Sequence, residues 1–351
     1  MAAKKEVLFG LDTFGDIPKD NTGKLMTYAG ALKQVVKEIE LADAVGVDVV
    51  ALGEHHREEF AISSPEVVLA SVATHTKRIK LASGVTVLSS DDPVRVFERF
   101  ATLDGLSDGR AQVILGRGSF TESFPLFGFD LKDYDALFEE KIALFSKLLE
   151  EKEFSWEGHF TQSLVNTNVF PKTASSSLDT WVGVGGSPES IIRAARYQFP
   201  VMLAIIGGSP ENFKSYVALY QQALKKFGFP VNKVGMHSHG FIADTQEEAV
   251  EIAWSNIKLS FDKIGVTRGW APMSREQFEN EMQYGSMYVG TPEVVAKKIA
   301  NSIITLNVDR FDLVYGAGEQ TTSAREHMIK LYGEKVIPRV KAILLENSHE
   351  H

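Results

Sequence analysis

The sequence contains no cysteine, although it is 351 residues long. Disulfides, a thiolate nucleophile and a cysteine-ligated metal or cluster are therefore excluded. Basic residues are also outnumbered, because 37 lysines and arginines stand against 46 aspartates and glutamates, which gives a net charge of −9. Since a nucleic-acid surface needs concentrated positive charge and the chain has no basic block, we expect no nucleic-acid partner.

Long apolar runs are missing as well. No uninterrupted apolar stretch reaches the length that crosses a bilayer, so we expect no membrane insertion. The start, residues 1–6, lacks the apolar core of a secretory signal, which predicts a cytoplasmic location. Apolar residues still make up 44 % of the chain, enough to bury a large core.

Three common functional motifs are also absent. No Gly-x-Gly-x-x-Gly opens a helix in the first βαβ unit, so a Rossmann nicotinamide site is not supported. There is no Gly-x-x-x-x-Gly-Lys-Ser/Thr phosphate loop and no His-Glu-x-x-His on a predicted helix.

Short β-branched runs alternate with helical patterns along the whole chain. Such alternation indicates a parallel sheet covered by helices. Eight strand–helix units predict an α/β fold, a closed (β/α)8 TIM barrel, with an insertion at about 151–178, containing short strands, after the fourth unit. A helix is predicted over 245–263, and residues at about 265–290 are expected to be irregular and to form a lid. No linker divides the chain, so we expect one domain over 1–351. The predicted strands are 7–11, 47–52, 79–88, 111–115, 180–184, 201–206, 234–243 and 311–315.

The second predicted strand, 47–52, is followed after Gly53 by Glu54-His55-His56. In a parallel barrel, ligands bind at the carboxyl ends of the strands. His55 or His56 could exchange a proton there near neutral pH. The alternative is that both rings belong to a surface cluster of ion pairs, and this stretch alone supports the two interpretations equally.

Two further strand ends are candidate anion sites. In Gly185-Gly186-Ser187-Pro188-Glu189-Ser190, the glycines free the backbone amides, Ser187 can cap the helix, and the helix N-terminus favours a phosphate. An ordinary helix start is the alternative, and Gly207-Gly208-Ser209-Pro210 repeats the pattern. Arg117, between Gly116 and Gly118, offers bidentate donors to phosphate, and its flanking glycines would let a flat ligand lie close. The alternative for Arg117 is a surface salt bridge.

His237 and His239 share one face of the seventh predicted strand. Together with Glu54, His55 and His56 they could form a hydrolase metal site. The pair lacks an obvious carboxylate partner in the sequence. A metal-dependent hydrolase is therefore kept only as a secondary interpretation, and the main expectation is a site without metal.

The Glu54-His55-His56 stretch, together with the motifs on its carboxyl side, resembles the bacterial luciferase-like family of flavin-dependent monooxygenases. The similarity covers nearly the whole chain and is densest over 53–131. It rests on an ordered series of motifs: Glu54-His55-His56 with Glu59-Phe60, Pro65, Ile79-Lys80-Leu81-Ala82-Ser83-Gly84-Val85, Asp92-Pro93-Val94-Arg95, Leu103-Asp104-Gly105-Leu106-Ser107-Asp108-Gly109-Arg110, Gly116-Arg117-Gly118, Phe127-Gly128, Glu157-Gly158-His159-Phe160, Gly185-Gly186-Ser187-Pro188-Glu189-Ser190 and Asp309-Arg310-Phe311.

The resemblance implies a TIM barrel that binds reduced FMN and uses O2 to oxidise a small organic substrate. Some branches of the superfamily use the deazaflavin F420 instead, and relatives with altered sites bind flavin without turnover. Because the chain has no nicotinamide module, a separate flavin reductase is implied. Relatives are usually homodimers. The family's luciferases carry a cysteine where this chain has Gly116, so light emission is not expected.

The resemblance also assigns roles to residues. His55 falls at the family's catalytic histidine, thought to act as a base or to stabilise the flavin during its reaction with oxygen, with His56 as close support. The Gly84-Val85 bond falls where the family often has a cis peptide under the flavin ring. The phosphate would be held by Arg117 and by the loop of Gly185, Gly186, Ser187 and Ser190. Tyr134 sits where some relatives contact the flavin tail.

Overall fold

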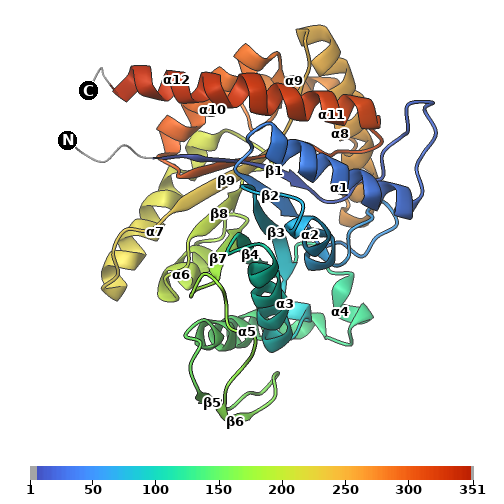
Figure 1. Ribbon diagram of the computed structural model, residues 1–351. Coiled ribbons are helices and arrows are strands. Elements are labelled where there is room, and N and C mark those ends of the chain that lie inside the picture. Colours follow the sequence, from blue (N-terminus) through green and yellow to red (C-terminus); the bar gives the residue numbers. More distant parts are fainter. Residues whose placement is uncertain (1–5, 349–351) are drawn as a thin grey trace.

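A closed barrel of eight parallel strands forms the centre of the molecule (Figure 1). The computed structural model describes residues 6–348, so the start on which the expected location rests lies almost wholly outside it. Pairing of β8 with β9 and of β11 with β1 closes the barrel, which confirms the predicted (β/α)8 architecture. The barrel strands are β1 (Leu8–Thr13), β2 (Val49–Leu52), β3 (Lys80–Val87), β4 (Ala111–Gly116), β7 (Asp179–Val184), β8 (Val201–Ala204), β9 (Val234–Ile242) and β11 (Arg310–Val314).

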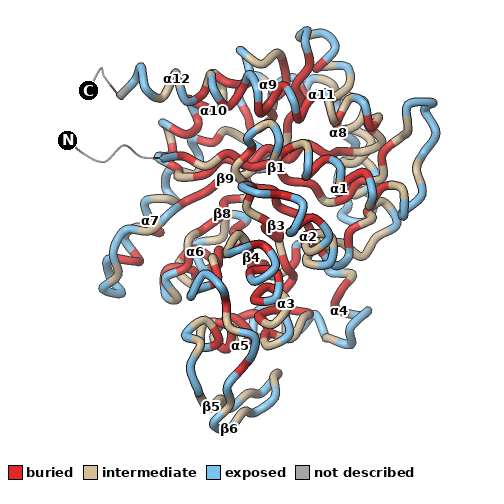
Figure 2. The backbone as a smooth tube through the Cα atoms, in the orientation of Figure 1, coloured by how far each residue is buried: buried red, intermediate tan, exposed pale blue. Residues whose placement is uncertain are grey.

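Helices surround the barrel and bury one face each against it. The strands are buried along their length, whereas the outward faces of the helices are exposed (Figure 2). This amphipathic arrangement is what the helical spacing of apolar residues predicts. The helices are α1 (Tyr28–Ala44), α2 (Pro65–Ala73), α3 (Pro93–Leu106), α4 (Ser123–Leu126), α5 (Tyr134–Leu148), α6 (Pro188–Arg196), α7 (Lys214–Phe227), α8 (Gln246–Arg268), α9 (Arg275–Gln283), α10 (Pro292–Leu306), α11 (Thr322–Leu331) and α12 (Ile337–Ser348).

A polar network fills the amino-terminal end of the barrel interior. Arg310, the first residue of β11, is fully buried, and its Nε lies 2.8 Å from Asp312 Oδ1. The Gln112 side chain accepts a hydrogen bond from Arg310 and donates to Asp179 Oδ2 at 2.7 Å. Because every charge here has a partner, the network closes this end of the barrel at a tolerable desolvation cost. Ligand sites are therefore expected at the opposite, carboxyl end of the barrel.

The predicted insertion contains a short antiparallel hairpin. Its strands, β5 (Phe154–Trp156) and β6 (Leu164–Thr167), pair with each other and with no barrel strand. The hairpin projects beyond α5, away from the other helices (Figure 1). The expectation of short strands within 151–178 is confirmed.

The expectation that residues 265–290 are irregular is wrong. Helix α8 continues to Arg268 and ends at Gly269, which is left-handed with φ +68°. Ser274 then caps α9, and β10 (Tyr288–Gly290) adds a parallel strand beside β9. Gly265 suggests a helix end, but it is accommodated inside the helix, where an added Cβ would lie 3.3 Å from Trp270 Cβ. Tertiary packing here overrides the local signal.

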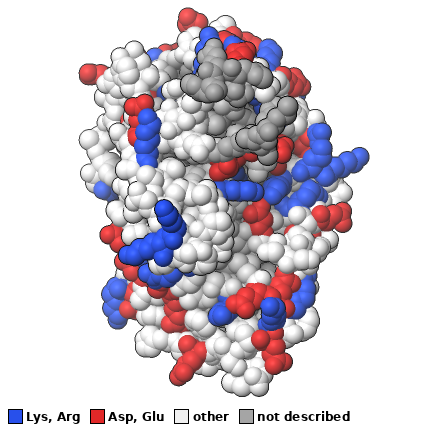
Figure 3. Space-filling view, turned by 90° about the vertical axis from the view of Figure 1, so that its left-hand side faces the viewer, with Lys and Arg blue, Asp and Glu red and all other residues white. Residues whose placement is uncertain are grey.

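The described part of the chain, 6–348, has no helix that is both long and apolar enough to cross a bilayer. On the face shown in Figure 3, acidic and basic side chains are intermixed between uncharged areas. The absence of a nucleic-acid partner stays a prediction.

Candidate active site

Three aromatic rings enclose His55 at the carboxyl end of β2. The Phe60 ring stacks on the imidazole with centroids 4.5 Å apart, and the Phe14 and Phe120 rings meet it edge-on at 5.1 and 4.6 Å. The His55 amide donates to the Ile62 carbonyl at 3.0 Å, which fixes the turn. These rings come from the loops after β1, β2 and β4, so the barrel itself assembles the enclosure. His55 is therefore a mouth residue rather than part of a surface ion-pair cluster.

The enclosure keeps the imidazole neutral. Burial is the main cause that lowers the pKa of His55 to about 3, and the positive charges of His56, Arg57 and Arg268 act in the same direction. The Nδ1 atom is buried and has no hydrogen-bond partner. A buried ring nitrogen without a partner is costly unless a ligand satisfies it. His55 thus offers a neutral imidazole to a ligand at the mouth.

This burial predicts that His55 does not titrate in the physiological range. In the ligand-free protein, its ring resonances in a 1H–15N spectrum should stay constant between pH 5 and pH 8, since the lowered pKa lies below that window. Comparison with the spectrum of His55→Asn assigns the signal. A midpoint near 6.5 for His55 would show that the enclosure is open to water.

His56 points to a different part of the mouth. Its Nε2 lies 3.0 Å from Glu54 Oε1, and its ring meets Phe127 edge-on at 5.2 Å. The other Glu54 oxygen accepts a hydrogen bond from the Val87 amide at 2.8 Å. His56 therefore holds the carboxylate that ties the end of β2 to the end of β3, and any support that it gives His55 is indirect.

The Gly84–Val85 peptide bond, which the resemblance singled out, is cis. The Val85 side chain packs toward β4 and β7, where a Cβ added to Gly116 would lie 2.4 Å from Val85 Cγ2 and one added to Gly183 would lie 2.8 Å from Val85 Cγ1. A Cβ added to Gly118 would likewise lie 2.6 Å from Val87 Cγ1. The glycines around Arg117 thus make room for side chains of β3. That they also let a flat ligand lie close stays a prediction.

The two predicted anion sites come together. Arg117, directly after β4, donates from Nη2 to Ser190 Oγ at 3.0 Å, and Ser190 Oγ lies 2.8 Å from Ser187 Oγ. Ser187 accepts from the Ser190 amide and so caps α6, as predicted. The guanidinium stacks over the Tyr134 ring, 5.3 Å from its centroid, and Nη1 pairs with Asp135 Oδ1 at 2.7 Å. We call Arg117, Ser187 and Ser190 the anion cluster.

A second arginine beside the anion cluster was missed in the sequence. Arg193 lies one turn after Ser190 on α6, and its Nε donates to Glu139 Oε2 at 2.6 Å. Its Nη1 is buried without a partner, and its Nη2 lies 4.0 Å from Asp135 Oδ1. Two guanidiniums, two hydroxyls and a helix N-terminus make this place suitable for a phosphate. The sequence did hold a signal for it: Arg193 lies three residues after Ser190, which places both side chains on the same side of a helix.

The backbone of the turn before α6 is also suited to an anion. A Cβ added to Gly185 would meet nothing within 4 Å, so the space beside this residue is open. Gly186 has φ +106°, a conformation that side chains disfavour. Ile191 and Ala194 are buried and hold α6 against the barrel, so its first turn stays at the mouth.

The interpretation of the His237 and His239 pair is corrected. His237 does have a carboxylate partner, because its Nδ1 lies 2.9 Å from Asp12 Oδ2 on β1. His239 lies nearer the mouth, 6.4 Å from the Phe14 ring, with its Nδ1 buried and unpartnered. Burial lowers the pKa of His239 to about 4. Residues 6–348 contain no group of three or more His, Asp or Glu side chains placed to hold a metal, so the hydrolase interpretation has no support.

The end of α8 reaches the loop after β4. The Arg268 guanidinium donates to the Ser119 carbonyl and lies 4.6 Å from the centroid of the Phe120 ring. Arg57 joins the same region by pairing with Glu122 at 2.8 Å and by donating to Thr267 at 3.4 Å. These contacts cover one side of the His55 enclosure. That residues 265–290 form a lid stays a prediction. The segment contains the end of α8 and all of α9.

The sequence over residues 16–310 matches the family described as luciferase-like monooxygenase. The chain belongs to this family. One relative, the N-acetyl-S-alkylcysteine monooxygenase of Bacillus subtilis (strain 168), is 27 % identical over 303 residues, which are 82 % of this chain and 88 % of the relative. Membership in the luciferase-like monooxygenase family makes the protein an oxidoreductase of this superfamily.

Solved structures share the fold. The oxygenating constituent of 3,6-diketocamphane monooxygenase from Pseudomonas putida, in complex with FMN, superposes with a TM-score of 0.76 at 18 % identity, covering 95 % of this chain and 99 % of that one. The coenzyme F420-dependent tetrahydromethanopterin reductase from Methanopyrus kandleri superposes with a TM-score of 0.71 at 19 % identity, with the same coverage. Proteins that share this fold thus include one solved in complex with FMN and one that depends on coenzyme F420.

Proposed function

We propose that this luciferase-like protein is an FMN-dependent monooxygenase that oxidises a small organic molecule with O2. One observation carries the proposal. The neutral His55 and the anion cluster lie after strands that surround the Gly84–Val85 bond, because β2, β3, β4 and β7 are consecutive neighbours in the barrel. This arrangement suits a ligand that has a flat ring at one end, beside His55 and the Gly84–Val85 bond, and a phosphate at the other end, at the anion cluster.

The residues at the mouth suit the parts of FMN. Arg117, Ser187, Ser190 and the first amides of α6 would hold the phosphate, with Arg193 as a further positive charge. The Gly84–Val85 segment would lie beneath the ring. When bound in reduced form, FMN supplies the electrons that reduce O2. A separate reductase would supply reduced FMN and the protein would form a homodimer, as the family resemblance implies. The expected setting is the cytoplasm.

His55 would hold or transfer a proton next to the flavin ring. Its buried Nδ1 has no partner, so a ligand atom can occupy that position at no cost to existing hydrogen bonds. An anionic ligand nearby would raise the lowered pKa of His55 and let it accept a proton. Phe14, Phe60, Phe120 and the end of α8 would exclude water from the same place.

Direct titration tests the cofactor. The protein is titrated separately with FMN and F420, each oxidised and reduced, and binding is followed by fluorescence. We expect reduced FMN to bind more tightly than reduced F420, and the bound form to consume O2. Tighter binding of F420 would favour an F420-dependent oxidoreductase, which could use the same anion cluster. Binding of FMN without oxidation of any substrate would instead indicate a non-catalytic flavin-binding barrel, and binding of neither would overturn the proposal.

A further inference from the structure

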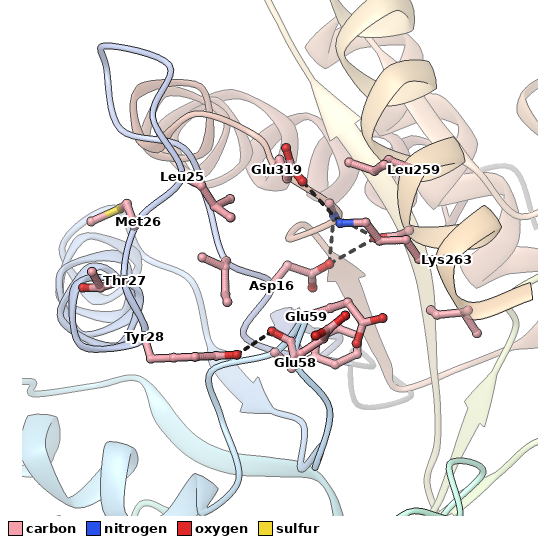
Figure 4. Close-up of a pocket in the computed structure, with 15 residues that line it drawn as sticks. Asp16, Leu25, Met26, Thr27, Tyr28, Glu58, Glu59, Leu259, Lys263 and Glu319 are labelled. Carbon is pink, nitrogen blue, oxygen red and sulfur yellow. Dashed lines mark hydrogen bonds and ion pairs between the residues drawn. The ribbon is translucent and has the colours of Figure 1, made fainter. Parts of the chain in front are cut away.

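A cavity of about 500 Å³ lies at the mouth of the barrel, on the side of β11, β1 and β2 (Figure 4). It is bordered by the loop after β1, the start of α1, the loop after β2, the second half of α8 and the loop after β11. Phe60 lines this cavity and also stacks on His55, so the two spaces share a wall. The anion cluster is formed by other loops, after β4 and β7, which leaves this cavity free for a ligand other than a phosphate.

Asp16 is the unusual group in the cavity. It is only 5 % exposed, and its Oδ1 accepts hydrogen bonds from the Gly318 amide at 2.8 Å and from Ser260 Oγ at 3.2 Å. Its Oδ2 is buried and has no partner. Figure 4 shows the Asp16 carboxylate between the segment of Leu25 and the helix of Lys263. A buried carboxylate oxygen without a hydrogen-bond donor is costly, so a ligand that supplies such a donor would be stabilised here.

The charges around the cavity favour a cationic donor. Four carboxylates line it, those of Asp16, Glu58, Glu59 and Glu319, against the single ammonium of Lys263. Glu59 is paired with Arg57, and Glu319 is paired with both Lys19 and Lys263. The side chain of Glu58 has no ion pair among the described residues, which leaves Asp16 and Glu58 to face the cavity. The positive charge of Arg325 acts on Asp16 but does not offset the effect of its burial. An anionic ligand would be repelled.

The rest of the lining is mainly apolar. Tyr28 is anchored by a hydrogen bond from its hydroxyl to the Glu58 carbonyl at 2.9 Å, so its ring forms a fixed wall. Such a lining stabilises an alkyl or aryl group by removing its surface from water. The apolar side chains that face the cavity are Ile17, Leu25, Met26, Phe60, Leu259 and Ile264.

We propose that this cavity binds a small molecule that has an apolar body and a protonated amine, with the amine on Asp16 Oδ2. The shared Phe60 wall places such a ligand next to His55. The further step that this ligand is the substrate rests on the proposed function. Binding of the ligand to the cavity does not.

The test compares three probes of equal chain length: octylamine, octanol and octanoate. Their binding to the full chain is measured by calorimetry at pH 7.5, with and without FMN. We expect octylamine to bind about tenfold more tightly than octanol, because a hydrogen bond to a charged group contributes roughly 1.5 kcal/mol or more. Octanoate should bind most weakly. Equal affinity for the three probes, or no binding of any, would overturn the proposal.

Asp16→Asn isolates the carboxylate. We expect it to remove the roughly tenfold preference for octylamine and to leave octanol within about twofold. Asp20→Asn is the matched control, because Asp20 lies in the same loop but its carboxylate accepts hydrogen bonds from Thr22 and Lys24 and, among the described residues, from no group of the cavity. An unchanged preference in Asp16→Asn would also refute the proposal. If Asp16→Asn does not fold, the comparison of probes on the unaltered chain still decides.

The outcomes separate this inference from the proposed function. Failure of FMN binding with an intact preference for octylamine would refute the flavin proposal alone. Normal FMN binding without an amine preference would refute the cavity proposal alone. Leu25→Ala should weaken octylamine and octanol by equal factors, since it removes apolar contact and no charge.

Discussion

Replacing His55 with asparagine is expected to lower product formation by about 100-fold to 10,000-fold while FMN stays bound. A positioned proton donor or acceptor contributes a factor of this order. Asparagine keeps a hydrogen-bonding group in the enclosure but cannot carry a proton between flavin and substrate. The measurement is product formed per reduced FMN in a single turnover, with a substrate found by screening the unaltered protein.

His75→Asn is the control for this change. His75 is exposed and lies just after the end of α2, and its Nδ1 is 3.6 Å from Glu40 Oε1. Neither residue belongs to the aromatic enclosure around His55. We expect its turnover to match that of the unaltered chain. Product formation by His55→Asn at the unaltered rate would show that His55 only shapes the pocket. Equal loss of FMN binding and of turnover would assign His55 to cofactor binding instead.

Most of the barrel could be predicted because each of its strands is a short buried run between turn signals. Periodicity identifies such elements well when they are amphipathic or fully apolar. The errors fall where a local signal misled. The helix predicted to end at Lys263 continues to Arg268, and β10 has only three residues, too few to recognise by pattern. Both features depend on packing against segments distant in sequence.

The sequence predicted individual residues of the candidate site but not the contacts between them. Arg117 and Ser190 were each chosen as anion ligands, but only the fold shows their contact across 73 positions of sequence. The partnership of His237 with Asp12 spans 225 positions and was missed for the same reason. The rings around His55 come from three loops, so no spacing along the chain reveals that its imidazole is desolvated.

Replacing Arg117 with glutamine is expected to weaken FMN binding by about 100-fold, or roughly 3 kcal/mol. Removing one partner of a buried, hydrogen-bonded charge pair costs this much, in part because the phosphate then lacks its counter-charge. Riboflavin, which has the same ring system without the phosphate, should bind both proteins with equal affinity. Fluorescence titration with the two flavins therefore separates phosphate recognition from a general distortion of the mouth.

Arg196→Gln provides the matched control for Arg117→Gln. Arg196 lies on α6 too, but its side chain is 53 % exposed and pairs with Glu139 at 2.7 Å. We expect both flavins to bind Arg196→Gln as they bind the unaltered chain. If Arg117→Gln weakened riboflavin as much as FMN, the arginine would act by holding Tyr134 and Ser190 in place. If neither flavin were affected, the phosphate would be held elsewhere, and the order of ring and phosphate proposed for the mouth would be wrong.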